Sequence, residues 1–462
     1  MTPLSNLAHR DIETLVHPYT NLAAFREQGP LVIERGQGVW LYDQAGKPYI
    51  DGMAGLWCTA LGHGNEELVE AAAAQMRKLA FGHLFTGKSH HGAIELAERI
   101  KEIAPVPTSK VFFCSSGSEA NDTQVKLVWY MNNALGRPRK KKIISRLKAY
   151  HGVTVAAASL TGLPNNHRDF DLPIAGILHT GCPHHYRFAE PGESEQDFAT
   201  RLAAELEALI LREGPDTVAA FIAEPVMGAG GVLVPPATYF EKITDVCKRH
   251  DVYMISDEII CGFGRLGSMF GCEALGFRPD SISVAKALTS AYVPMAAVTV
   301  PEVMYQALID ESRKIGTFGH GFTYSGHPVA AAVALKTLEI YTRENIVAQV
   351  QRKMPQFQAR LCALAAHPLV GEARGAGLVG GIEMVAEKAS RRAFNPKAAV
   401  GPRAVQFAED EGLIVRFLPG DVVSICPPLI ITAAEVDELF DRLTRALDRT
   451  LDWATRERLF AA

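Results

Sequence analysis

Two adjacent acids and a lysine stand near the ends of two apolar runs, and their side chains have the clearest chemical potential in the chain. The run 252–260 carries Asp257 and Glu258, and the run 281–286 ends in Lys286. Successive side chains of a strand point to opposite faces, so one acid can enter a pocket while the other serves elsewhere. A carboxylate and a lysine at neighbouring strand ends suit a cofactor with a basic ring nitrogen and an aldehyde.

Pyridoxal 5'-phosphate (PLP) has both of these groups. Lys286 would form the Schiff base with the aldehyde, and the carboxylate would keep the pyridine nitrogen protonated. Taken alone, either residue would more often be an ordinary strand-end acid or a surface lysine. The interpretation therefore depends on the motifs around them.

Apolar runs that alternate with helices determine the expected fold. Strands are predicted at 111–114, 142–145, 217–224, 252–260, 281–286 and 295–300, with a helix from the turn 115–118 to about 133 and another at about 236–250. Strands that are apolar throughout indicate a mostly parallel sheet covered on both faces. Ligands of such sheets bind beyond the carboxyl ends of the strands, where Tyr150, Glu224, Asp257 and Lys286 all fall.

A strand, a Ser/Gly turn and a helix start predict an anion site at 115–122. The backbone N–H groups of Gly117 and Ser118 and the helix dipole favour a phosphate there. A simple serine N-cap is the alternative. The segment contains no GxxxxGK[ST] pattern, so it is not a Walker loop.

Four further residues are candidates for the site, and three of them have two interpretations each. Tyr150 follows a strand and is well placed to stack on a flat ring, and His151 is either structural or catalytic. Trp57 either walls a pocket or fills a core. Arg416, at the end of a predicted strand 412–416 and close to Pro419-Gly420, can clamp a carboxylate or form a surface ion pair.

Two motifs suggest other chemistry. The run 262–267 fits G-x-G-x-x-G, but glycines and a proline interrupt the segment that follows, where a dinucleotide site needs a long apolar helix. Cys182-Pro-His-His185 resembles a metal-binding fragment, but no partner cluster follows it in the sequence. We therefore expect no metal.

The bulk composition is that of an ordinary soluble enzyme. The 462 residues are 48% hydrophobic and 21% charged with a net charge of -4, which suggests two domains and gives no hint of nucleic acid or membrane. None of the eight cysteines pairs as CxxC, and the first residues lack the apolar core of a signal peptide. These features predict a reducing, cytoplasmic location.

The motifs together resemble class III (omega) aminotransferases of PLP fold type I. The resemblance covers nearly the whole chain and is carried by the segments 114–122, 150–152, 224–225, 256–265, 285–286 and the loop 320–328. The segment 51–57 is similar to the amine:pyruvate branch in particular. The resemblance implies a large domain with a mostly parallel sheet (61–335), a smaller α+β domain (336–462), and an N-terminal segment (1–60) that joins the small domain.

The resemblance also implies roles for matching positions. Lys286 and Asp257 would be catalytic, and the cofactor would contact Ser116, Gly117, Ser118, Tyr150, His151, Glu224, Ile259, Phe322 and Thr323, with Thr323 supplied by the partner of a homodimer or tetramer. The substrate pocket would be lined by Tyr19, Trp57, Tyr150 and Arg416, with Leu84 and Phe85 from across the interface. Arg416 would move to bind a carboxylate or to admit a simple amine.

The implied activity is transfer of an amino group from an amine or omega-amino acid to a keto acid such as pyruvate. Decarboxylation or aminomutation on the same fold is the nearest alternative. A dinucleotide oxidoreductase built on 262–267 and a non-catalytic protein of the PLP fold are more remote. Two departures from the family pattern, at 287–292 and at 417–419, leave the substrate range open.

Overall fold

The computed structural model describes residues 4–460. The strands are β1 (Ile33–Gln37), β2 (Trp40–Asp43), β3 (Pro48–Asp51), β4 (Lys110–Cys114), β5 (Lys142–Arg146), β6 (Ile177–Thr180), β7 (Val218–Ala223), β8 (Tyr253–Asp257), β9 (Ser281–Val284), β10 (Ala296–Val300), β11 (Val370–Ala376), β12 (Val379–Met384), β13 (Leu413–Ile414), β14 (Arg416–Leu418) and β15 (Val422–Ile425). The longer helices are α1 (Asn6–Thr14), α4 (Glu66–Lys78), α5 (His91–Ile103), α6 (Gly117–Ala134), α9 (Glu195–Glu213), α10 (Tyr239–Arg249), α12 (Glu302–Ile315), α13 (Pro328–Arg343), α14 (Ile346–Ala363), α15 (Val400–Asp410) and α16 (Ala433–Arg456). The shorter helices are α2 (Leu22–Gln28), α3 (Ala54–Trp57), α7 (Val155–Leu160), α8 (His185–Phe188) and α11 (Gly271–Ala274).

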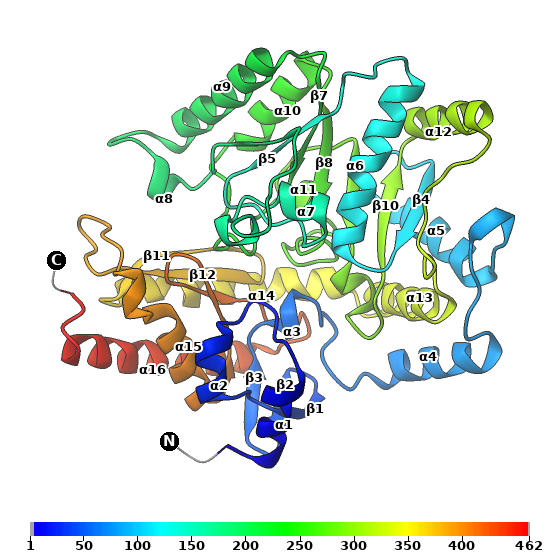
Figure 1. Cartoon of the computed structure of the whole chain (residues 1–462). Helices are drawn as coiled ribbons and strands as arrows, with labels where there is room; N and C mark the ends of the chain where they lie inside the picture. Colours follow the sequence, from blue (N-terminus) through cyan, green and yellow to red (C-terminus); the bar gives the residue numbers. More distant parts are fainter. Residues whose placement is uncertain (1–3, 461–462) are drawn as a thin grey trace.

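A seven-stranded sheet forms the centre of the larger part of the molecule, in the upper half of Figure 1. Its order is β4-β10-β9-β8-β7-β5-β6, and the pairs from β9 to β6 are parallel. The mostly parallel sheet is therefore confirmed. β10 differs, because it runs antiparallel to both β4 and β9.

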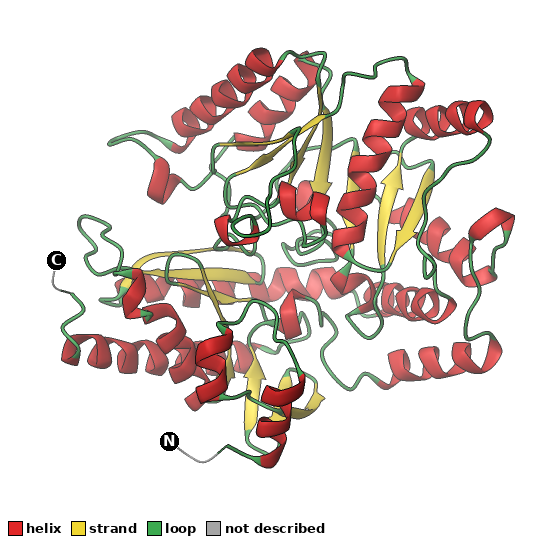
Figure 2. Cartoon of the chain, in the orientation of Figure 1, coloured by secondary structure: helices red, strands yellow, loops and turns green. Residues whose placement is uncertain are grey.

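Helices cover both faces of this sheet (Figure 2). β7 is buried along its whole length, and its side chains are divided between two apolar clusters. Phe221 packs with residues of α9 and α10 on one face, whereas Ile222 packs with residues of α6 on the other. This burial on both sides explains why the strand sequences are apolar throughout.

Two four-stranded sheets lie in the other part of the molecule. One has the order β11-β12-β15-β14, and the other joins β1, β2 and β3 to β13. The pairing of β3 with β13 connects the N-terminal segment to the C-terminal part of the chain. This contact agrees with the expectation for residues 1–60, while the domain boundaries at 60 and 335 stay a prediction.

The structure corrects the prediction for the segment 412–416. It does not form one strand, because β13 ends at Ile414 and β14 begins at Arg416. Arg416 therefore starts a strand instead of ending one, and the Pro419-Gly420 turn lies between β14 and β15. β11 was not predicted, because its sequence, VGEARGA, has no apolar alternation. Across residues 4–460, no helix is both long enough and apolar enough to cross a membrane.

Candidate active site

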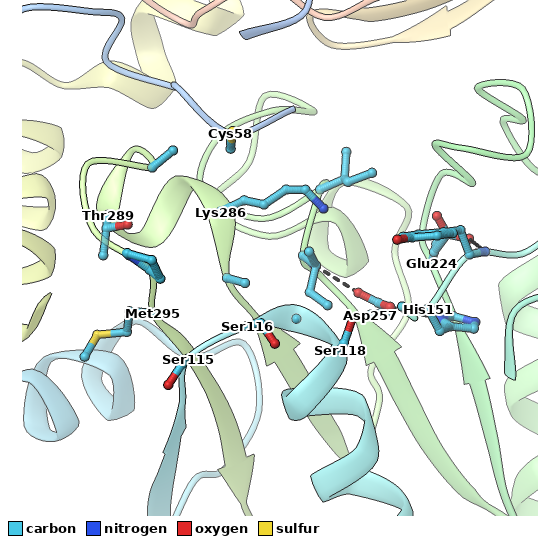
Figure 3. A pocket seen from close by; sticks show the side chains of 18 of the residues that line it. Cys58, Ser115, Ser116, Ser118, His151, Glu224, Asp257, Lys286, Thr289 and Met295 are labelled. Carbon is cyan, nitrogen blue, oxygen red and sulfur yellow. Dashed lines mark hydrogen bonds and ion pairs between the residues drawn. The ribbon is translucent and has the colours of Figure 1, made fainter. Parts of the chain in front are cut away.

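A cavity of about 310 Å³ lies beyond the carboxyl ends of the central strands. The predicted cofactor residues that line it are Ser116, Gly117, Ser118, Tyr150, His151, Glu224, Asp257, Ile259 and Lys286. Figure 3 shows the Lys286 side chain extending across this pocket towards the side that holds Asp257 and Glu224. The convergence expected from strand ends is therefore present within one chain.

Asp257 is the last residue of β8 and is held by groups from three segments. Its Oδ2 atom accepts a hydrogen bond from Asn121 Nδ2 at 2.8 Å and lies 2.7 Å from His151 Nδ1. Its Oδ1 atom accepts the backbone N–H of Ile259 at 3.1 Å. These bonds fix the orientation of a carboxylate that is only 3% exposed. A buried, oriented carboxylate can hold a positive charge at a fixed point of the cavity.

Glu258 serves elsewhere, as strand alternation predicts. Its carboxylate accepts the backbone N–H groups of Gly271 and Cys272 at 2.7 and 2.8 Å, and the hydroxyl of Ser256 at 3.0 Å. Burial raises the pKa of this carboxyl. Glu258 therefore fixes the loop that leads into α11 and takes no part in the cavity.

Lys286 follows β9 and begins a short 3-10 turn with a positive φ of 47°. Among residues 4–460, no carboxylate lies within 4.0 Å of its ammonium group, and burial lowers the pKa of this lysine. A buried lysine without an ion-pair partner has a larger neutral fraction, and the neutral amine is the nucleophile and base. The site thus favours covalent and proton-transfer chemistry at Nζ.

The sequence left open whether the turn before α6 is a serine N-cap or an anion site, and the structure has the features of both. Ser116 is the N-cap, and its Oγ atom accepts the backbone N–H of Glu119 at 3.2 Å. Gly117 begins the helix where an added Cβ would stand 2.7 Å from Cδ1 of Ile259, so only glycine fits without a shift. The start of an 18-residue helix at the cavity wall is suited to a phosphate.

Glu224 connects two loops of the site. Its Oε1 atom accepts the backbone N–H of Tyr150 at 3.0 Å, and its Oε2 atom accepts that of Gly228 at 3.0 Å. Burial raises the pKa of this carboxyl. The contacts show that Glu224 positions the residue predicted to stack on the ring, and its direct contact with a cofactor stays a prediction.

Tyr19 and Arg416 lie next to Tyr150, outside the residues that line the cavity. The rings of Tyr19 and Tyr150 meet edge to face at 6.4 Å, and the Arg416 guanidinium lies 5.8 Å from the Tyr19 ring centroid. Burial lowers the pKa of Arg416, and within the described chain no carboxylate lies within 4.0 Å of it. Arg416 is therefore not a surface ion-pair residue.

The remaining predicted residues do not reach the Lys286 cavity of their own chain. Trp57 is 3% exposed and packs in an apolar cluster with Met53 and Val226. Leu84 and Phe85 line a different cavity together with 319–321, Phe322 packs against the cluster on the α6 face, and Thr323 is exposed. Their contribution to a site across an interface stays a prediction.

Two residues of the site were not predicted. Asn121 is fully buried inside α6, where an asparagine is disfavoured, and it bonds both Asp257 and the carbonyl of His151. Its position one turn after the Ser/Gly turn was the available signal. Cys58 lines the cavity, and burial raises the pKa of its thiol.

In the folded chain, two glutamates from distant parts of the sequence lie close to His184 of the Cys182–His185 fragment. His184 Nε2 lies 2.9 Å from Glu372 Oε2, and Glu383 is close to both. Arg374 contacts both carboxylates, at 2.5 and 2.8 Å, and Arg187 pairs with Glu383 at 2.5 Å. The glutamates are thus neutralised by arginines, and the cluster joins α8 to the β11–β12 sheet.

The cavity fits PLP. A buried carboxylate, a buried lysine without an ion pair and a helix N-terminus provide one partner each for the ring nitrogen, the aldehyde and the phosphate. The fold and this site together define a PLP-dependent enzyme of fold type I.

Comparison with known proteins identifies the family. Residues 23–447 match the model of "Aminotransferase class-III". The chain is 52% identical over 422 residues to gamma aminobutyrate transaminase 3, chloroplastic, of Solanum lycopersicum, covering 91% of this chain and 81% of the relative. It is 50% identical to vanillin aminotransferase of Capsicum annuum, covering 91% and 92%. The omega transaminase of Pseudomonas jessenii in complex with PMP superposes with a TM-score of 0.95 at 53% identity, covering 98% and 99%.

The chain belongs to the class III aminotransferases and is a PLP-dependent aminotransferase. The predicted family, fold class, enzyme class and cofactor are thereby confirmed. The dinucleotide reading of 262–267 is not supported, because this segment forms buried turns and the next helix, α11, has only four residues.

Proposed function

We propose that this aminotransferase takes its amino group from a primary amine or an omega-amino acid and passes it to a keto acid such as pyruvate. The observation that carries the proposal is the joint position of Lys286 and Asp257 at one buried cavity, with Arg416 nearby and free of an ion pair. The names of the relatives, a gamma aminobutyrate transaminase and a vanillin aminotransferase, support donors whose amino group is remote from any carboxylate.

PLP, when bound, supplies an aldehyde for the amino group and a ring that accepts the electron pair of the broken C–H bond. With the cofactor bound, Lys286 would hold its aldehyde. The neutral Nζ atom of Lys286 would then take a proton from the donor carbon and return it to the carbon on the other side of the nitrogen. The lowered pKa of Lys286 serves this step, because it increases the fraction of base.

The other residues of the site stabilise charge on the cofactor and orient the substrate. The Asp257 carboxylate is held by Asn121 and His151. It would keep the ring nitrogen of the cofactor protonated and so stabilise the negative charge that develops during proton transfer. The burial of Asp257 and Lys286 excludes water and strengthens these interactions. Arg416 binds the carboxylate of the keto acid in the second half-reaction.

The experiment measures the two half-reactions separately by stopped-flow absorbance. The holoenzyme is mixed with n-propylamine, and the aminated enzyme is then mixed with pyruvate. We expect conversion in both directions and release of alanine. A parallel run uses an omega-amino acid as the donor, because n-propylamine has no carboxyl group to lose. Carbon dioxide release in that run, or a product in which the amino group has moved within the donor, would show decarboxylation or aminomutation instead.

We also propose a homodimer in which Leu84, Phe85 and Thr323 complete the site of the partner. Support comes from their distance from the cavity of their own chain and from the exposed aromatic side chains Phe81, Phe85 and Tyr324, which lie in the same two segments. Mixing a Lys286→Ala protein with a Thr323→Ala protein would regenerate one complete site per heterodimer and restore activity. Light scattering gives the mass, and a monomer would contradict the proposal.

A cytoplasmic location is a further proposal. It is supported by the cysteines, all of which are free in the structure. Fractionation of the producing cell with an antibody to the protein tests it. A signal confined to an organelle fraction would contradict it, and several relatives are named as chloroplastic or mitochondrial.

A further inference from the structure

A second cavity, of about 580 Å³, opens on the outer side of Tyr19. We call it the vestibule and define it by its lining residues: Tyr19, Thr20, Asn21, Val153, Val155, Ala158, Asn165, Asn166, Phe170 and Leu172. It shares no lining residue with the Lys286 cavity. Tyr19 borders the vestibule and Tyr150 borders the Lys286 cavity, so their edge-to-face pair separates the two spaces.

The vestibule presents apolar side chains to solvent to an unusual degree. Val153 is 57% exposed, Val155 63% and Phe170 69%. Exposed apolar side chains that gather in one patch often mark a binding surface. Within the described chain, no charged side chain lines the vestibule. The polar half of the lining consists of neutral hydroxyls and amides, so the vestibule suits a group without charge, and its apolar half can cover a hydrocarbon chain.

The side chain of Tyr19 is positioned as a gate between the vestibule and the Lys286 cavity. Asn166 Nδ2 donates a hydrogen bond to the phenol oxygen of Tyr19 at 2.6 Å. The backbone of Tyr19 has a positive φ of 52°, which is uncommon for a large side chain. One hydrogen bond from the vestibule wall thus holds a ring that otherwise contacts Tyr150 and Arg416.

We infer that the vestibule is the subsite for the apolar tail of a long amine donor, and that Asn166 is a positioning residue that sets the Tyr19 gate. This inference rests on the proposed function. The amino group of the donor meets Lys286, the tail passes Tyr19, and a chain of several methylenes or an aryl group ends among Val153, Val155 and Phe170. Pyruvate is too short to reach the vestibule and uses Arg416 alone.

The test is a series of donors from n-propylamine to n-octylamine with the holoenzyme. We expect kcat/KM of the donor half-reaction to rise with each methylene that enters the vestibule, by up to about fourfold per CH₂, which corresponds to its transfer out of water. The pyruvate half-reaction serves as an internal reference. A flat profile would overturn the inference, whereas the proposed function fails only if n-propylamine also gives no amino transfer.

A matched pair of variants locates the tail. Val155 is the first residue of α7 and Val303 the second residue of α12, and they are 63% and 59% exposed. Val155→Asn should flatten the rise for the longest donors and leave n-propylamine unchanged, whereas Val303→Asn should keep the wild-type profile. If both variants keep the rise, the tail lies elsewhere. If Val155→Asn instead lowers the oligomeric mass and the activity towards all donors, the patch is a contact between copies of the chain.

The gate has its own test. Asn166→Leu removes only the bond to Tyr19, whereas Tyr19→Phe also removes the phenol's contact with Tyr150. Each should change kcat/KM for n-octylamine relative to n-propylamine, and adding Asn166→Leu to Tyr19→Phe should change nothing further. A merely structural role would lower kcat for all donors alike. Additive losses in the double variant would show that the bond does not set the gate.

Discussion

Oδ2 of Asp257 lies 2.7 Å from Nδ1 of His151, and the two side chains are only 3% and 0% exposed. Because an ionised carboxylate can only accept, Nδ1 carries the hydrogen and donates it. Asn121 donates a second hydrogen bond to the same oxygen. The other oxygen of Asp257 accepts the backbone N–H of Ile259. The orientation of Asp257 therefore depends on Asn121 in α6 and on His151 in the loop after β5.

Asn121→Leu should impair catalysis without unfolding the protein. A lost hydrogen bond to a charged group is worth about 1.5–3 kcal/mol, so we expect kcat to fall by roughly tenfold to a hundredfold. Asn133→Leu changes an exposed asparagine of the same helix and should keep the wild-type rate. Retention of the PLP absorbance band confirms that the site is intact. Equal kcat values for the two variants would contradict a role in positioning Asp257.

Lys286→Ala should abolish turnover while the phosphate contacts still retain the cofactor. No other lysine lines the cavity among residues 4–460. Borohydride reduction of the wild type followed by peptide mapping should place the label on Lys286. A label on another lysine would refute the assignment.

Asp257→Asn should fold and bind PLP but lose at least about a hundredfold in kcat, because stabilisation of a developing charge is worth several kcal/mol. The side chain keeps its size, but its new NH₂ group faces a donor, so the loss combines the missing charge with at least one missing hydrogen bond. The single-turnover rate with n-propylamine is the measurement. A rate close to that of the wild type would make the acid merely structural.

Arg416→Ala should separate the two half-reactions. The loss of a charge-assisted pair should raise KM for pyruvate about tenfold or more, and the half-reaction with an amine lacking a carboxylate should change little. Arg403→Ala, on a half-buried arginine of α15 away from the cavity, is the control. Equal losses in both half-reactions would mean that Arg416 supports the structure and does not select the substrate.

Glu409 should make the stability depend on pH. Burial, followed by the charge of Asp410, raises its pKa to about 7 from the ordinary glutamate value of 4.5. The folded state then binds more protons than the unfolded state between these values, so the free energy of unfolding falls as pH rises through this window. Glu409→Gln should raise Tm by a few degrees at pH 8 and leave it unchanged at pH 4. An equal shift at both values would exclude titration as the cause.

The strands and helices around the cofactor were predictable because their signals are local. β7 is apolar throughout, β8 is apolar up to Ser256, and the turn at 115–118 precedes a helix, so the position of Asp257 and Lys286 followed from strand ends. The reversed direction of β10 was not predictable in this way. Its composition resembles that of the parallel strands of the same sheet, and direction depends on the path of the chain outside the strand.

Functional residues whose interaction partners lie far away in the sequence were harder to predict. Asn121 bonds Asp257, which lies 136 positions later, and no local pattern marks that contact. Arg416 was found, but its place at the start of β14 was missed, because the break at Val415 depends on β13 and β14 pairing with different strands. The Glu372 and Glu383 partners of His184 were missed for the same reason.

The pairing of β3 with β13 also has a consequence for biosynthesis. Ile50 emerges from the ribosome early, but its pairing partner Leu413 emerges about 360 residues later. At roughly 5–20 residues per second, the edge of β3 waits on the order of 20–70 s for its neighbour. The nascent strands β1 to β3 therefore have an open edge during most of translation, and an unpaired strand edge of this kind is prone to aggregation.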